Sequence, residues 1–441
     1  MRNYNIHPGA LLLSALVLSL AIFSFAYRRQ RPVAATGTRN CLIVSDIHFS
    51  PLLGSSEKDT ALKRKLLAWS LDNWKVYFEG KPAEMQMDSN MLFKDANYAI
   101  LESAVANMKR KLPNPAFIVI AGDFIWHNAT PADSLLKKKT IQFIAKLFKE
   151  NFPGTLIVPA MGNNDTYGND YDLQDPKFLN DFADAWAPNL LRTSGDSLKK
   201  NGYYSCEQGN LKFLVMNSAL LYANGNHPDT AAFMLKWVKA SLAGANGKNV
   251  WIVMHIPPGV NGYNGQDFWR KEYARDFVNT VAKYSSTVRF VICSHIHFDD
   301  FKVIYSRGKK PAPVSFIRLV PSVCSNHGNY PSFEVARLSS TGDSIINETS
   351  WYLNLSKVRR GIPPRLVPWA DSINLKNNFK LKEISATGFS ELINTIKTDK
   401  TGQAIKSYAN FYDVGSPIGV LTINKDTYLK YLKADSLKAS Q

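Results

Sequence analysis

Five short clusters in this chain combine residues that could perform metal or acid–base chemistry, and each cluster follows a short apolar run. The clusters are Asp46-Ile47-His48, Gly122-Asp123, Gly162-Asn163-Asn164-Asp165, His255 and His295-Ile296-His297. Carboxylate, imidazole and amide oxygen form a mixed ligand set that suits Zn²⁺, Mn²⁺ or Fe. Five of the eight histidines in 441 residues lie in or near these clusters. Any one cluster is a weak signal, but their joint occurrence in a consistent order predicts a metal centre.

The chemistry that such a set supports is hydrolysis at phosphorus. One carboxylate can bridge two ions about 3.5–4 Å apart, and the pair lowers the pKa of a water and neutralises charge on phosphoryl oxygens. Asp123, which follows the apolar run 117–121 after Gly122, is the candidate bridge. Gly122 before it allows close approach of the backbone.

The clusters require elements that bring them together. Apolar runs at 41–45, 116–121, 155–159, 211–217, 250–254 and 288–294 are typical of buried strands. Helical patterns near 95–111, 132–150, 229–243 and 267–283 separate most of them, which indicates an α/β fold. A hairpin at 203–207 and 212–217, and successive strands at 301–305, 314–319 and 333–338, predict mixed rather than purely parallel sheets. Open α/β sheets carry functional groups beyond the carboxyl ends of strands, where every cluster lies.

The two ends of the chain are expected to lie outside the catalytic domain. Residues 1–26 contain an apolar stretch from Ala10 to Ala26 that predicts an export signal or an uncleaved anchor. Residues 27–38 are expected to be a linker, residues 39–356 the catalytic domain, and residues 357–441 a C-terminal helical extension after Pro363, Pro364 and Pro368. Arginines directly after the apolar stretch favour keeping the chain that follows it in the cytoplasm. The prediction of export therefore rests partly on the resemblance given below.

The composition of the chain limits the classes of binding partner that we expect. The net charge of +17 permits contact with an anionic membrane surface, but the lysines are scattered, so no specific nucleic-acid partner is expected. The four cysteines allow three disulfide pairings, and the sequence does not choose among them. It does not define the oligomeric state either.

With these residues in view, the chain resembles the calcineurin-like metallophosphoesterase superfamily, and within it the acid sphingomyelinase-like phosphodiesterases. The supporting motifs are Gly122-Asp123 with His127 four residues after the Asp, His255-Ile256-Pro257-Pro258-Gly259, and the segments Pro321–Val323, Asn329–Phe333 and Trp351–Leu355. The resemblance spans roughly residues 40–415. It implies a four-layer α-β-β-α sandwich of two mixed sheets flanked by helices, with a C-terminal helical part.

The resemblance also implies the ligands of two divalent ions, with zinc as the default and manganese, iron or magnesium as alternatives. One ion would be held by Asp46, His48, Asp123 and His297, and the other by Asp123, Asn163, His255 and His295. Asp165 would orient its neighbours, and Tyr167 and His327 are candidates for lining the pocket.

One position departs from the family pattern. Relatives usually carry a histidine where this chain has Asn164, and an amide can bind phosphate but cannot deliver a proton. Either His127 takes the role of the acid, or the leaving group needs little help. The expected function is therefore an exported two-metal phosphodiesterase acting on a phospholipid headgroup or a nucleotide derivative. Two alternatives stay open: hydrolysis of polyphosphate or nucleoside triphosphates, and a metal-holding binding protein with weak catalysis.

Overall fold

The computed structural model describes residues 37–53, 59–80, 87–172, 175–190, 192–225, 228–262, 265–359 and 361–418, together with Leu429 and Leu432. The predicted signal or anchor and nearly all of the predicted linker lie outside these residues. Residues 38–441 form one compact unit. None of the helices in the described part of the chain combines the length and apolar character needed to cross a membrane.

Two six-stranded mixed sheets form the centre of this unit, as the sequence predicts. The first has the order β12-β11-β10-β1-β2-β3. Its bounds are β1 Arg39–Val44, β2 Phe117–Ile120, β3 Leu156–Pro159, β10 Ser332–Leu338, β11 Ile345–Tyr352 and β12 Asp371–Asn374. Strands β1, β2 and β3 run parallel, so their carboxyl ends lie at the same edge.

The second sheet has the order β4-β5-β6-β7-β9-β8. Its bounds are β4 Tyr204–Gln208, β5 Leu211–Val215, β6 Asn249–Val253, β7 Val288–Cys293, β8 Asp300–Tyr305 and β9 Pro313–Leu319. The predicted hairpin is β4–β5, and β5, β6, β7 and β9 run parallel. This sheet therefore also delivers several carboxyl ends to one edge.

Aromatic side chains between the sheets join them into one core. The ring of Phe117 on β2 lies 5.0 Å from that of Phe213 on β5 and 5.3 Å from that of Trp251 on β6, both in edge-to-face geometry. All three side chains are fully buried. Edge-to-face pairs stabilise by about 0.5–1.5 kcal/mol beyond area burial, so this cluster fixes how the sheets face each other.

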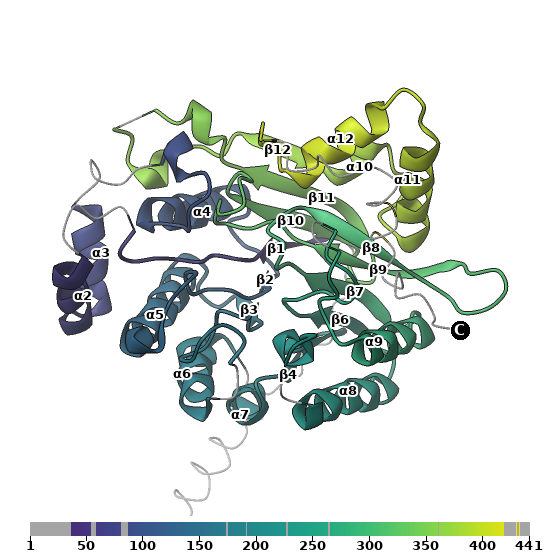
Figure 1. Cartoon of the computed structure of the whole chain (residues 1–441), viewed down its shortest axis with the longest axis horizontal. Coiled ribbons are helices and arrows are strands. Elements are labelled where there is room, and N and C mark those ends of the chain that lie inside the picture. Colours follow the sequence, from purple (N-terminus) through teal and green to yellow (C-terminus); the bar gives the residue numbers. More distant parts are fainter. Residues whose placement is uncertain are drawn as a thin grey trace, which may run out of the picture. The chain divides into compact units, whose positions relative to one another are not determined.

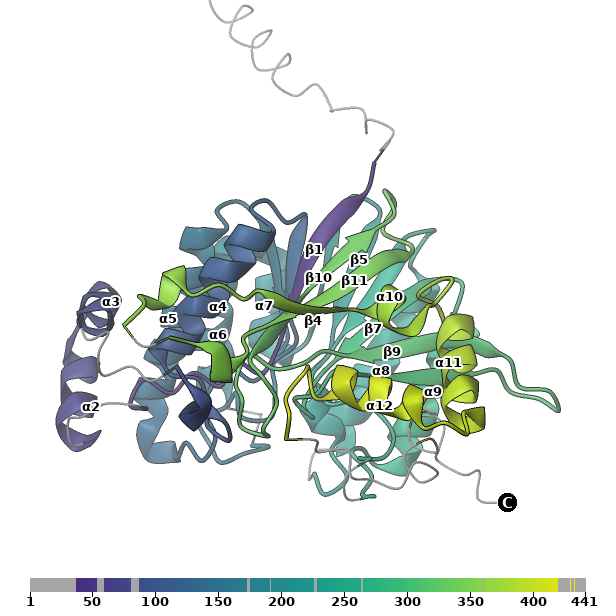
Figure 2. The same ribbon diagram turned by 90° about the horizontal axis from the view of Figure 1, so that it is seen from above.

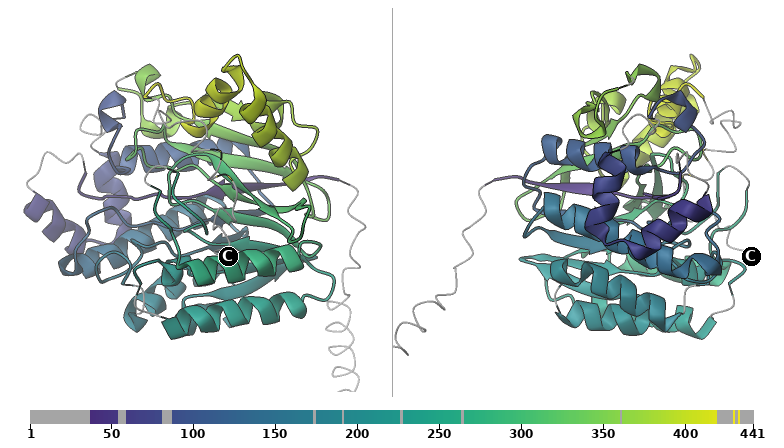
Figure 3. Two further views of the ribbon diagram at one scale, coloured as in Figure 1. Left: turned by 45° about the vertical axis from the view of Figure 1, so that its right-hand side comes forward. Right: turned by 90° about the vertical axis from the view of Figure 1, so that its left-hand side faces the viewer.

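Helices flank the two sheets (Figure 1). Those that precede β9 are α2 Asp59–Ala68, α3 Leu71–Glu79, α4 Tyr98–Lys111, α5 Ser134–Asn151, α6 Pro176–Trp186, α7 Arg192–Asn201, α8 Pro228–Ala243 and α9 Lys271–Lys283. Helices α4, α5 and α6 lie on the side of the first sheet, and α8 and α9 run beside each other on the side of the second (Figures 1 and 3). Helix α4 begins where sequence favours a start, since the Asn97 side chain accepts from the Ile100 N–H at 3.0 Å.

The C-terminal region contains more than helices. Helices α10 Leu375–Phe379, α11 Ala386–Thr398 and α12 Gln403–Tyr412 follow β12. Strand β12 pairs antiparallel with β11 and extends the first sheet, a strand that the expected helical extension at 357–441 did not include. Helix α11 packs against β8 and β9 of the second sheet (Figure 2). The proposed boundary near residue 356 thus falls within a continuous sheet.

A fully buried ionic cluster also joins the sheets. Arg318 on β9 contacts Glu334 on β10 at 2.8 Å, Asp299 at 2.7 Å, and Glu348 on β11. Burial raises the pKa of Asp299 to about 7 although Arg318 opposes the shift. Burial and the Glu348 charge also raise the pKa of Glu334. One guanidinium faces three carboxylates, so protons held by the acids make up part of the charge balance.

All four cysteines lie in the described part of the chain and are free, buried thiols, so none of the three possible pairings forms in this structure.

Candidate metal centre

The carboxyl ends of strands from both sheets supply the predicted ligands. In the first sheet, Asp46 and His48 follow β1, Asp123 follows β2, and Asn163 follows β3. In the second, His255 follows β6, and His295 and His297 follow β7. Groups widely separated in sequence therefore meet where the two parallel edges adjoin.

The backbone is strained at five of these seven positions. Positive φ values occur at Asp46 (46°), His48 (40°), Asp123 (56°), His295 (74°) and His297 (68°). Side-chain-bearing residues seldom adopt this region, and such strain gathers at functional sites. Hydrogen bonds hold the first two turns together, since the Asp46 and His48 N–H groups donate to the Gly122 and Asp123 carbonyls, each at 3.0 Å.

One group of side chains gathers around Asp46. The Nε2 atom of His48 lies 3.7 Å from Asp46 Oδ1 and 3.4 Å from Asp123 Oδ2. The Nε2 atom of His297 lies 3.4 Å from Asp46 Oδ1. Ligand atoms of Asp46, His48 and Asp123 all lie within 4.8 Å of one another.

A second group gathers around Asp123. His255 Nε2 lies 3.0 Å from Asp123 Oδ2 and 3.3 Å from His295 Nδ1. Ligand atoms of Asp123, His255 and His295 also lie within 4.8 Å of one another. Asp123 belongs to both groups, which is the position that a bridging carboxylate requires.

Unpartnered buried atoms test whether these residues fit cations. Asp46 Oδ1, His48 Nε2 and Asn163 Oδ1 are buried without a hydrogen-bond partner. Leaving a buried polar atom unsatisfied costs about 1–3 kcal/mol. All three are electron-pair donors on predicted ligands, so a divalent ion would satisfy each of them. The donor set fits the metal centre that the sequence predicts.

In three of the candidate ligand histidines, the protein contacts the ring nitrogen that faces away from the centre. His48 Nδ1 lies 2.8 Å from the Ile125 carbonyl, and His255 Nδ1 lies 2.8 Å from the Ala121 carbonyl. His297 Nδ1 lies 3.4 Å from the Cys324 thiol. A proton on Nδ1 leaves the Nε2 lone pair facing the centre, as metal ligation by histidine requires.

The clustered charges shift the pKa values in opposite directions. Burial alone would lower the pKa of His48, but nearby carboxylates, Asp123 foremost, raise it to about 9. The same balance raises the pKa of His255 to about 10. Burial lowers the pKa of His295 to about 3, and the neighbouring His255 adds to the shift. Burial alone would raise the pKa of Asp123, but the charges of His255 and His48 hold it well below its usual range.

Asp165 organises the two loops that carry Asp123 and Asn163. Its buried carboxylate accepts from the N–H groups of Asp123 (2.9 Å), Phe124 (2.9 Å) and Gly162 (2.8 Å). Burial and the Asp123 charge raise the pKa of Asp165 to about 6. The side chain points into the loops, so it holds backbone rather than facing the cavity.

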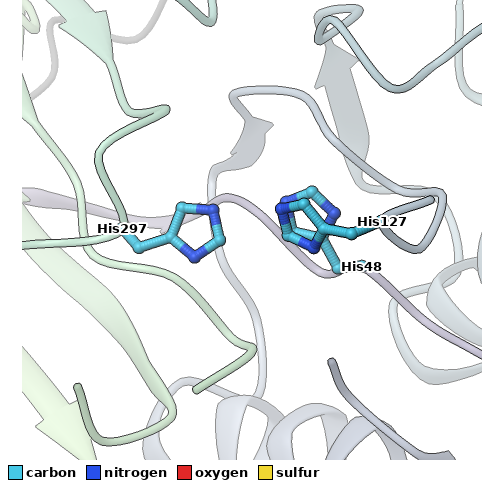
Figure 4. A group of neighbouring side chains, drawn as sticks. All are labelled: His48, His127 and His297. Atoms are coloured by element: carbon cyan, nitrogen blue, oxygen red, sulfur yellow. The ribbon is translucent and has the colours of Figure 1, made fainter. Parts of the chain in front are cut away.

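His127 stands beside the first group and has a partner that sequence reasoning missed. Its ring stacks on His48 with centroids 3.8 Å apart, and Figure 4 shows His297 beside this pair. His127 Nδ1 lies 2.6 Å from Asp95 Oδ1, and the backbone N–H of His127 donates to Asp95 Oδ2 at 3.0 Å. Asp95 precedes a helix, where a carboxylate is ordinary, so no local signal marks it.

Asn164 is turned onto Asp123. Its N–H donates to Asp123 Oδ1 at 2.9 Å, and its Nδ2 donates to Asp123 Oδ2 at 3.0 Å. In this arrangement the Asn164 amide stabilises the carboxylate at the centre of the site.

A cavity of about 590 Å³ opens over both groups. Asp123, His127, Asn163, Asn164, His295 and His297 line it, together with Phe93, Asp170, Tyr171, Asn261, Ile296, Phe298, Asn326, His327 and Tyr412. His327 therefore lines the cavity as expected. The expectation for Tyr167 is wrong: it is not among the lining residues, and its hydroxyl donates to Asp181 at 2.7 Å.

The chain is similar to known proteins in sequence. The sequence model of the calcineurin-like phosphoesterase family matches residues 40–299. The chain is 26% identical to acid sphingomyelinase-like phosphodiesterase 3b of Homo sapiens over 349 residues, 74% of this chain and 75% of that protein. It is 24% identical to cyclic GMP-AMP phosphodiesterase SMPDL3A of Bos taurus over 336 residues, 72% and 73% of the two chains. Among solved structures, PhoD aligns with a TM-score of 0.43 and 10% identity over 75% of this chain and 73% of that one.

The chain belongs to the calcineurin-like phosphoesterase family. Within it, the chain is similar to the acid sphingomyelinase-like phosphodiesterases, as the motifs predict. It is a metal-dependent hydrolase of phosphoric esters.

Proposed function

We propose that this protein is a two-metal phosphodiesterase whose ions are held by the seven residues predicted from sequence. The observation that carries the proposal is the meeting of these residues from two sheets, with unpartnered donor atoms on Asp46, His48 and Asn163. Asp46, His48, Asp123 and His297 would hold one ion, and Asp123, Asn163, His255 and His295 the other. Two divalent ions would lower the pKa of a water, and their positive charge would neutralise the charge on the phosphoryl oxygens. Zinc is the default, because imidazole and carboxylate both suit it.

The chain itself supplies the remaining catalytic groups. Asn164 donates two hydrogen bonds to Asp123, and its amide cannot act as a general acid. His127 is the proposed acid: with Nδ1 directed to Asp95, its Nε2 can carry the proton that passes to the departing oxygen as the phosphorus–oxygen bond breaks. Asp165 keeps the Asp123 and Asn163 loops in register.

The lining of the cavity favours a phosphodiester over polyphosphate or a nucleoside triphosphate. Among the described residues that line it, none is lysine or arginine, while Phe93, Tyr171, Phe298 and Tyr412 are aromatic. A chain of phosphates would bring several charges past the two ions with no side-chain cation to meet them. A single phosphodiester charge needs only the ions, and its substituents can rest on aromatic faces. Phospholipid headgroups and nucleotide derivatives both have this form, and relatives are named for substrates of each kind.

The third function, a binding protein with weak catalysis, is less well supported. It requires the acid to be lost along with the usual histidine, yet His127 has a carboxylate partner at 2.6 Å and lines the cavity. A site kept only for binding would not need that pair.

We also propose that the protein works outside the cytoplasm, in the periplasm, outside the cell or anchored to a membrane. The support is the apolar stretch from Ala10 to Ala26. The net charge of +17 would favour contact with an anionic membrane surface, as a lipid substrate requires.

The test is hydrolysis by the purified protein after chelation and after addition of Zn²⁺ or Mn²⁺. Bis-p-nitrophenyl phosphate, sphingomyelin and polyphosphate separate the three functions. We expect metal-dependent turnover of the first, and Asp123→Asn should lower it by about 10³-fold or more because it removes the shared ligand charge. Asp229→Asn, at the exposed start of α8, is the matched control and should leave turnover unchanged.

Two results would contradict the proposal. Polyphosphate turnover well above that of every diester would favour the anhydride hydrolase. A metal-loaded protein inactive on all three compounds would favour the binding protein.

A further inference from the structure

Asn163 differs from the other proposed ligands because only one of its two side-chain ends can bind a cation. The amide oxygen offers a lone pair, whereas the NH₂ group offers only hydrogens. If the amide turned by 180°, it would place two hydrogens against the ion. Something in the protein must therefore select the orientation.

Asp170 makes the contact that selects it. Asn163 Nδ2 donates to Asp170 Oδ1 at 2.8 Å, which leaves Asn163 Oδ1 buried and without a hydrogen-bond partner. An ionised carboxylate only accepts hydrogen bonds, so it can pair with the NH₂ end but not with the oxygen. Asn163 is 4% exposed, so solvent does not compete for the amide.

The loop around Asp170 is fixed at several points. The Tyr171 N–H donates to the Asn163 carbonyl at 3.1 Å, and buried Lys137 donates to the Gly168 carbonyl at 2.9 Å. The Tyr171 ring stacks on Tyr222 with centroids 4.0 Å apart. These contacts are made by the protein alone and place the carboxylate beside Asn163.

We propose that Asp170 is a positioning residue that holds the Asn163 oxygen toward the metal centre and thereby sets the affinity for one of the two ions. The inference rests on the proposed metal centre and assigns a role to a residue outside its ligand set. Outer partners of metal ligands typically change affinity by about 10–100-fold when removed.

A simpler electrostatic effect is the main rival. A nearby negative charge would attract a cation even without orienting Asn163. The two effects separate in an Asn163→Asp background, because a carboxylate presents oxygen at both ends and needs no orientation. Removal of Asp170 from that background also relieves repulsion between two acids.

The experiment measures Mn²⁺ binding by electron paramagnetic resonance to four metal-stripped proteins: wild type, Asp170→Ala, Asn163→Asp and the double variant. We expect Asp170→Ala to weaken one of two Mn²⁺ sites by about 10–100-fold. In the Asn163→Asp background the same change should weaken neither site. Thermal unfolding of the metal-free proteins checks that all four fold.

Equal weakening by Asp170→Ala in both backgrounds would overturn the inference, because charge or folding would then be the cause. Unchanged Mn²⁺ binding in the single variant would overturn it as well. Wild type that binds no Mn²⁺ at all would remove the proposed metal centre itself, and that outcome is distinct from the other two.

Discussion

His127, the proposed acid, lines the cavity, and Asp95 lies 2.6 Å from its Nδ1. An alkoxide leaving group needs a proton and p-nitrophenolate does not. His127→Ala should therefore lower turnover of alkyl phosphodiesters by about 10²–10⁴-fold and that of p-nitrophenyl esters far less. Paired substrates that differ only in the leaving group measure the effect. His327 lines the same cavity and makes no hydrogen bond to a carboxylate within the described part of the chain. The control His327→Ala should therefore affect both substrates equally. Equal losses in His127→Ala would rule out His127 as the acid.

The raised pKa values of His48 and His255, about 9 and about 10, predict how stability depends on pH without metal. Both exceed the unfolded value of about 6.5, so the folded state binds these protons more tightly. Their contribution is complete below about pH 6.5 and is lost as pH rises through 9–10. The urea midpoint of metal-free protein should fall over that window, and His255→Gln should flatten the slope. A slope unchanged by His255→Gln would contradict this account.

Sequence analysis singled out the candidate ligands but not the side chains that contact them. Asp46, His48 and Asp123 are visible because they follow apolar strands and have ligand chemistry. Asp95 and Asp170 act through contacts 32 and 7 residues away in sequence, in segments where acids are common for other reasons. Only the folded arrangement reveals their roles.

At the scale of elements, the Arg318 cluster connects β9 with β10 and β11 through buried ion pairs. Arg318→Met should lower the free energy of unfolding by about 3–5 kcal/mol, because it leaves buried carboxylates unpaired. Urea unfolding measures the loss. Arg337→Met, on the exposed face of β10, is the matched control and should change stability by less than about 0.5 kcal/mol. A loss below about 1 kcal/mol in Arg318→Met would show that protonated acids tolerate the missing cation.

The elements differ in how well sequence predicted them. Strands β2, β6 and β7 were predicted within a residue or two, because each is a mainly apolar run that is buried along all or nearly all of its length. Strand β12, Asp371–Asn374, was missed because it is four residues long and all but one of them are polar. Its role as a strand depends on pairing with β11. A short edge strand has no periodic pattern to detect.

At the scale of the whole unit, the alternation of strands and helices predicted an α/β fold, and the hairpin predicted mixed sheets. The family resemblance implied that there are two of them. The alternation could not predict that residues after 356 would complete the first sheet through β12. That pairing joins segments that no local pattern relates.

The proposed ligands come from both sheets, so bound ions would cross-link them. Chelation should therefore speed amide hydrogen exchange in the turns after β1 and β6, because binding to the folded state stabilises it. The interior around Phe117 and Trp251, which needs no ion, should stay protected. Mass spectrometry of exchange with and without Zn²⁺ measures both regions. Uniform acceleration throughout would instead indicate global destabilisation.

The left-handed backbone at Asp46, His48, Asp123, His295 and His297 also limits how this site can change over evolution. Asparagine, aspartate and glycine tolerate that conformation best, whereas β-branched residues do not. A lineage that abandons catalysis would therefore first acquire asparagine or glycine at the two aspartates, and valine or isoleucine there would damage the turn as well as the chemistry. A substitution at these positions therefore changes the proposed ligand set and the shape of the turn together.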